Sequence, residues 1–234
     1  MVELKAMSDE DFDREGRMSA TELNSVQDVS SLMHRFCSIG ANCEFGIFQG
    51  SLGCHPIDLL KNAYTPLESL IELLNADLYA LADPAHIRLN VETNEGHFMA
   101  FNQRFGMRWH GWAKPDGSGV TEMIEAEARR MRRLVEKMLD DIAVGERIFV
   151  RRAAVEERIE DVYALQTAMA RHGANPILLW VDSESGPLTR HSGLLHGHIP
   201  TSLGTPDQTN VPKTEWLELC RSVLAGAESQ SCNG

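Results

Sequence analysis

The sequence has no long apolar run, and it has fewer basic than acidic residues. No apolar run approaches the roughly 20 residues that a membrane-spanning helix requires, so we expect no membrane span. The N-terminus has no basic segment followed by an apolar one, which predicts no secretory signal and a cytoplasmic protein. Lysine and arginine number 22 against 34 aspartate and glutamate residues, giving a net charge of −12. Because this charge repels phosphate, we expect no nucleic-acid partner.

Closely paired cysteines and common nucleotide, hydrolase and metal motifs are also missing. None of the five cysteines forms a C-x-x-C pair, which favours free thiols over a disulfide framework or a zinc finger. The chain has no G-x-S-x-G, G-x-x-x-x-G-K-[ST], H-E-x-x-H or G-x-G-x-x-G motif. His191, His196 and His198 lie in a glycine-rich segment with no cysteine or acid close by in the sequence, and we interpret it as a solvated loop. We therefore expect no metal and no other cofactor.

Apolar residues recur with helix and strand periods between two polar ends. Residues 1–28 are acidic and predict a flexible tail, as do residues 227–234, which leaves 29–226 as a single α/β domain. The patterns predict strands at 35–39, 87–91, 97–102, 107–112, 148–150 and 177–181, and helices at 43–52, from 65 onward, and at 121–143, 159–169 and 212–224. The middle strands favour antiparallel pairing and the later ones parallel pairing. We predict a three-layer α/β fold with a mixed, partly antiparallel sheet.

The segment from Ser38 to Gly46 combines a strand, a turn of small residues and a cysteine at a helix start. Unpaired N–H groups and the helix dipole at such a position stabilise a thiolate, so Cys43 is the candidate nucleophile. Gly40 and Asn42 in the turn are candidates for substrate binding. The alternative interpretation is that Cys43 is a small core residue.

A cysteine nucleophile needs a base and a group that orients this base. His110 is the first candidate base, because it lies late on a predicted strand between Trp109 and Trp112, which we expect to contact substrate. His55, in a loop only twelve residues after Cys43, is the second candidate base. Asp58 and Asp182 are the candidate acids, the second because it follows a strongly apolar strand. Structural alternatives remain for each: a histidine packed between tryptophans, a helix cap and a turn aspartate.

Three segments resemble an uncharacterised bacterial family described as papain-like cysteine peptidases. These are Ser38-Ile39-Gly40-x-Asn42-Cys43, Pro56-Ile57-Asp58 and Phe105-Gly106-Met107-x-Trp109-His110. The family has Pro-Phe-Asp-Trp at the second segment and an acid after the histidine, where this chain has Gly111. The resemblance implies that Cys43 is the nucleophile, His110 the base and Asp58 a supporting acid.

Two functions follow as hypotheses. The first is a cysteine-dependent hydrolase or acyl-transfer enzyme that uses Cys43 and His110 on a small-molecule, peptide or glycan-linked substrate. The second is a nucleotide- or sugar-phosphate-binding protein of a glycan pathway, glycosyltransferase-like or accessory, in which the Gly40 turn holds a phosphate on backbone N–H groups. A catalytically inactive relative is the third reading. The arginines at 129–133 fit intrahelical ion pairs with Glu125 and Glu127.

Overall fold

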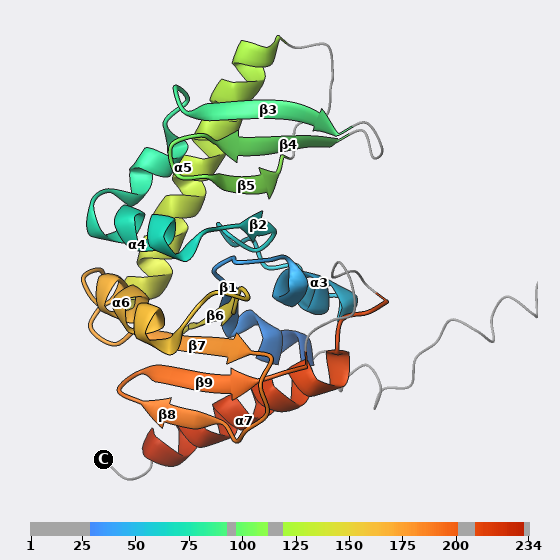
Figure 1. The fold of residues 1–234 in the computed structure, drawn as a ribbon, viewed down its shortest axis with the longest axis vertical. Coiled ribbons are helices and arrows are strands. Elements are labelled where there is room, and N and C mark those ends of the chain that lie inside the picture. The colour runs from blue at the N-terminus through green and yellow to red at the C-terminus, as the bar shows by residue number, and fades with distance from the viewer. Residues whose placement is uncertain (1–28, 93–96, 112–118, 201–208, 232–234) are drawn as a thin grey trace, which may run out of the picture.

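Two β-sheets form the framework of the molecule and lie one above the other in Figure 1. The computed structural model describes residues 29–92, 97–111, 119–200 and 209–231. The predicted tail at 1–28 and the candidate Trp112 lie outside the described residues. Among the described residues, no helix is both long and apolar enough to cross a membrane.

The lower sheet has five strands in the order β1-β6-β7-β9-β8. Its strands are β1 (Phe36–Ser38), β6 (Ile148–Arg152), β7 (Ile177–Asp182), β8 (Thr189–His191) and β9 (Leu194–His198). The first four in spatial order pair in parallel, and β8 pairs antiparallel to β9 at the edge. Every residue of β6 is buried, which is why its sequence shows no alternation: a parallel strand covered on both faces has no solvent side.

The upper sheet has four antiparallel strands in the order β2-β5-β4-β3, of which β3, β4 and β5 form a meander. Its strands are β2 (Ala63–Tyr64), β3 (Ile87–Glu92), β4 (His97–Asn102) and β5 (Met107–His110). Residues of β5 alternate between buried and exposed, as expected for a strand with one face on the core. This alternation buries Trp109 and exposes His110.

Helices cover both faces of the lower sheet, and the long helix α5 (Val120–Val144) runs alongside both sheets (Figure 1). The helical elements are α3 (Glu44–Ser51), α4 (Leu67–Asn75), η1 (Leu78–Ala82), α5 (Val120–Val144), α6 (Ile159–Met169) and α7 (Lys213–Ser231). α3 and α7 pack on one face of the lower sheet, where Phe45 and Phe48 contact the ring of Trp216. α4, α5 and α6 share the other core with strands of both sheets.

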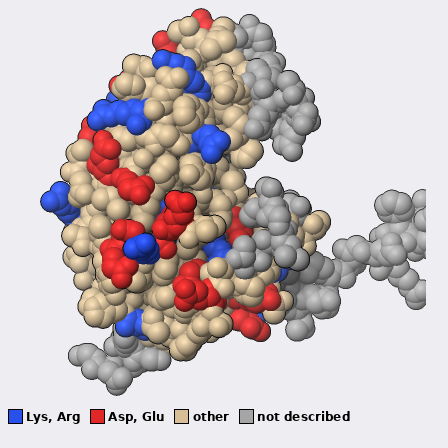
Figure 2. Space-filling view, in the orientation of Figure 1, with Lys and Arg blue, Asp and Glu red and all other residues tan. Residues whose placement is uncertain are grey.

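The structure confirms the predicted α/β class with both parallel and antiparallel pairing. The middle strands β3, β4 and β5, which we expected to pair antiparallel, form a separate sheet with β2, and the lower sheet is itself mixed because β8 pairs antiparallel to β9. The observed elements differ from the predicted ones at two further places. Residues 189–191 and 194–198 are strands, and α7 continues to Ser231, past the expected start of a tail at 227. On the face shown in Figure 2, acidic and basic side chains form separate small groups, and neither sign makes one continuous patch.

Candidate functional site

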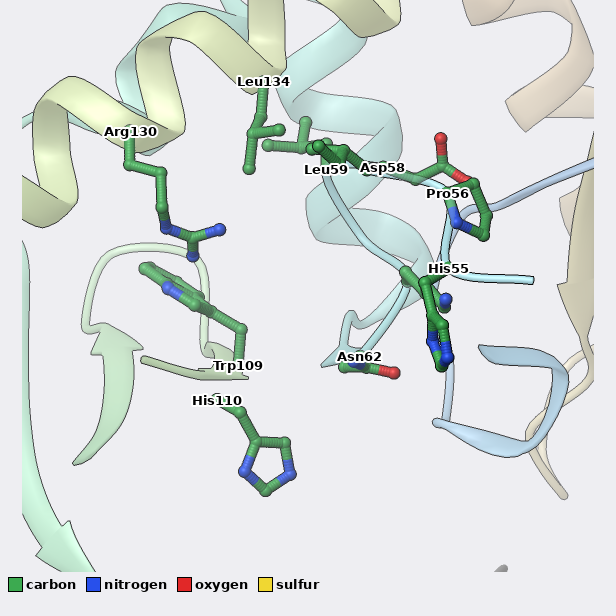
Figure 3. Close-up of a pocket in the computed structure, with 11 residues that line it drawn as sticks. His55, Pro56, Asp58, Leu59, Asn62, Trp109, His110, Arg130 and Leu134 are labelled. Carbon is green, nitrogen blue, oxygen red and sulfur yellow. The ribbon is translucent and has the colours of Figure 1, made fainter. Parts of the chain in front are cut away.

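A pocket of about 370 Å³ lies between the upper sheet, α5 and the segment that follows α3. Figure 3 shows His55 on one side of this pocket and Trp109 with His110 on the other. The lining residues are His55, Pro56, Ile57, Asp58, Leu59, Lys61, Asn62, Trp109, His110, Arg130 and Leu134. The lining thus combines apolar residues with four basic side chains, those of His55, Lys61, His110 and Arg130. Such a lining suits a small organic molecule.

A hydrogen-bonded chain fixes one wall of this pocket. The indole Nε1 of buried Trp109 donates to Glu127 Oε1 at 2.6 Å, and Arg130 forms an ion pair with the same carboxylate. Glu127 and Arg130 are three residues apart on α5, so the predicted intrahelical pairing is confirmed here. Trp109 therefore lines the pocket with its indole N–H already satisfied, and the exposed His110 next to it is also a lining residue.

Cys43 is not among the residues that line the pocket. It is the N-cap residue of α3, and its thiol is partly exposed. Gly46, one turn later, packs so closely that an added Cβ would lie 2.5 Å from the Lys61 carbonyl oxygen and 2.8 Å from Asn62 Oδ1. Residues three apart share a helix face, so this first turn of α3 borders the pocket wall formed by Lys61 and Asn62.

Burial raises the pKa of the Cys43 thiol above its ordinary value of 9.0. This is the opposite of the direction expected from a helix start, and its cause is burial, which disfavours the charged thiolate. In the part of the chain that the structure describes, no hydrogen bond joins Cys43 to His110.

The turn before Cys43 is shaped by packing. Gly40 and Ala41 are buried and both have positive φ, +85° and +74°. A Cβ on Gly40 would lie 2.6 Å from Thr65 Oγ1, so only glycine fits there. Asn42 Oδ1 accepts the Glu44 backbone N–H at 3.0 Å and so caps the start of α3. Gly40 and Asn42, the two residues of this turn that we predicted to bind substrate, thus have structural roles that account for them.

Asp58 turns its carboxylate away from the pocket (Figure 3). Its side chain is 0% exposed, and Arg147 donates to both carboxylate oxygens at 2.7 and 3.4 Å. Lys137 Nζ lies 3.6 Å from the same group. Asp58 therefore anchors α5 and the residue that precedes β6 to the pocket segment, and it contacts neither His110 nor Cys43.

Asp182 does hold histidines, but they are not the one predicted. Its Oδ2 lies 2.7 Å from His196 Nε2 and its Oδ1 lies 2.6 Å from His198 Nδ1. Burial raises the pKa of the Asp182 carboxyl, but the hydrogen bonds from the two histidines outweigh it and keep the pKa below its ordinary value. The interpretation of this histidine segment as a solvated loop without a nearby acid is wrong, because β9 pairs with β7 and brings His198 opposite Asp182.

A sequence signal for this cluster exists. His196 and His198 are two residues apart, the spacing that places both side chains on one face of a strand. Leu194 and Leu195 are the buried start of this strand, and the glycines at 193 and 197 obscure the strand pattern in the sequence.

Comparison of the chain with protein-family models, curated proteins and solved structures finds no match in any of the three.

Proposed function

We propose that this chain is a hydrolase or acyl-transfer enzyme that acts on a small organic molecule bound in the pocket between the sheets. The observation that supports this most is the pocket itself, with His110 and His55 on opposite sides and the first turn of α3, which starts at Cys43, beside its wall. In this proposal Cys43 is the nucleophile and His110 the base, as the resemblance to papain-like cysteine peptidases implies.

The raised pKa of Cys43 determines when the thiol proton is removed. A neutral thiol must lose its proton as it attacks, so the base acts in the substrate complex and not in the free protein. The imidazole of His110 takes the thiol proton while the Sγ–carbon bond forms and the bond from the acyl carbon to the leaving group breaks. The protonated imidazole gives this proton to the leaving group. It then takes a proton from the water that attacks the thioester carbon, and it returns that proton to Cys43 Sγ as the bond between Sγ and the acyl carbon breaks.

An acyl probe tests this proposal without knowledge of the natural substrate. The protein is mixed with p-nitrophenyl acetate, nitrophenolate release is followed, and the acetylated residue is located by mass spectrometry. We expect a burst with the acetyl group on Cys43, no burst in Cys43→Ser, and slowing by about 100-fold or more in His110→Ala. His86→Ala is the matched control, because His86 is an exposed histidine near Asp83, outside the residues that line the pocket.

Two outcomes would contradict the proposal. The first is acetylation of wild type no faster than of Cys43→Ser. The second is an effect of His110→Ala no larger than that of His86→Ala. Iodoacetamide labelling checks the pKa of Cys43 separately: because the rate follows the thiolate fraction, a raised pKa predicts slow labelling at pH 7 and a rate that is still rising with pH at 9.0.

The basic lining favours one alternative, a protein that binds a sugar phosphate or nucleotide without acyl chemistry. Lys61, Arg130 and the two histidines would attract an anion, although burial lowers the pKa of Lys61. The Gly40 turn is filled by Thr65, so the phosphate would bind in the pocket instead. Thermal shifts with a panel of nucleotide sugars, lost in Lys61→Met and kept in Cys43→Ser, would favour this alternative over the enzyme.

A further inference from the structure

We propose that Asp182, His196 and His198 bind a divalent transition-metal ion of the zinc type, at a site separate from the pocket described above. The ligand atoms of these three residues all lie within 4.8 Å of one another. Two imidazole nitrogens and one carboxylate oxygen are a donor set that zinc and its first-row neighbours accept, and three protein ligands leave a position open for water or substrate.

The strands position these ligands rigidly. His196 and His198 project from the same face of β9, and the register pairs His198 with Asp182 and His196 with Trp180 on β7. The Asp182 backbone is fixed by the Ile199 N–H, which donates to its carbonyl oxygen at 3.0 Å, and by Arg152, which donates to the same oxygen. The Trp180 ring packs against His196 with ring centroids 4.6 Å apart, which limits rotation of that imidazole.

The spacing of the ligand atoms is close to what a metal requires. Tetrahedral zinc with bonds of about 2.0–2.1 Å holds its ligand atoms about 3.4 Å apart. The two histidine nitrogens now lie 2.7 and 2.6 Å from the carboxylate oxygens. These two separations must therefore open by about 0.7 and about 0.8 Å when an ion replaces the hydrogen bonds. The side chains are 24%, 12% and 10% exposed for His196, Asp182 and His198, so solvent reaches the site.

A second group in the described part of the chain has metal-ligating atoms close together, formed by Cys37, Asp58 and Asp141. Both of its carboxylates are already neutralised by Arg147 and Lys137. An ion there would have to displace two cations and ionise a fully buried thiol. Within the described residues, the Asp182 carboxylate has no lysine or arginine ion pair to displace, and besides the two histidines the Glu184 N–H donates to its Oδ1 at 3.0 Å. The histidine cluster is therefore the better site.

Zinc binding to chelator-treated full-length protein tests this inference by calorimetry and by thermal unfolding with and without Zn²⁺. We expect one equivalent of Zn²⁺ to bind and to raise the unfolding temperature. His196→Ala, His198→Ala and Asp182→Asn are each expected to weaken binding by more than about 100-fold, since loss of a supporting contact alone costs 10–100-fold. His191→Ala is the matched control, because His191 lies on neighbouring β8 with its ring against Tyr163.

Stoichiometric zinc binding that survives in His196→Ala and His198→Ala would overturn the inference. So would the absence of binding to the wild type at zinc concentrations up to about 100 μM, because a binding free energy would then be weaker than about −5.5 kcal/mol. Far-UV circular dichroism of each metal-free variant separates lost ligands from lost fold, and His198→Gln, which keeps most of the volume, repeats the test if an alanine variant unfolds. Cys43→Ser should bind zinc normally, so failure of the acyl-transfer proposal and failure of this one are distinguishable.

Discussion

Replacing Arg147 with alanine tests the ion network that fixes the pocket segment. The variant would leave the Asp58 carboxylate, which is 0% exposed, with Lys137 Nζ at 3.6 Å as its remaining cation. It would also remove the donor to the Phe36 carbonyl oxygen at 2.8 Å and the contact with Asp141. Removing one partner of a buried ion pair costs about 3–5 kcal/mol, because the other charge stays buried without compensation.

Urea unfolding followed by far-UV circular dichroism measures this cost. Arg129→Ala is the matched control: Arg129 is 66% exposed and pairs with Glu125 at 3.8 Å, so its loss should change the free energy of unfolding by about 0.5 kcal/mol or less. The double variant Arg147→Ala/Asp58→Asn removes the stranded charge as well. It should be more stable than the sum of the two single effects by about 1–3 kcal/mol.

A loss below about 1 kcal/mol in Arg147→Ala, or strict additivity in the double variant, would refute this account of Asp58. The result bears on function. If the network is as strong as the structure indicates, loss of activity in an Asp58 variant reports a displaced pocket wall and not a lost catalytic acid.

Two further predictions concern the turn and the helix that surround Cys43. Gly40→Ala should lose about 1–3 kcal/mol more stability than Gly53→Ala, because both positions have positive φ but only Gly40 faces Thr65, while Gly53 has no atom within 4 Å of an added Cβ. Equal urea midpoints for the two variants would contradict this. Trp216→Phe should cost about 1–3 kcal/mol beyond its lost volume, because it leaves the buried Glu44 carboxylate without its 2.9 Å indole donor; an unfolding free energy unchanged from wild type would show that Glu44 does not need this bond.

Of the candidate site, the sequence identified residue types and strand ends but not their partners. Asp182 ends a strand, as its position after an apolar segment predicted, and His110 ends β5, although the predicted strand continued to residue 112. They belong to different sheets, so Asp182 cannot orient His110 across one shared edge. Strand order is a long-range property, and nothing within a window of ten residues distinguishes one mixed sheet from two.

By itself the sequence determined where most helices and strands begin and end. Steps of three and four between apolar residues predict α5, and short apolar runs bounded by glycine or polar turns predict β6 and β7. Those signals are local, so they need no knowledge of neighbours. Only the tertiary structure decided that Asp58 pairs with Arg147, 89 residues away, and that Asp182 meets His198. These contacts depend on which strands lie side by side and in which register, and that is set by how all the apolar faces pack together.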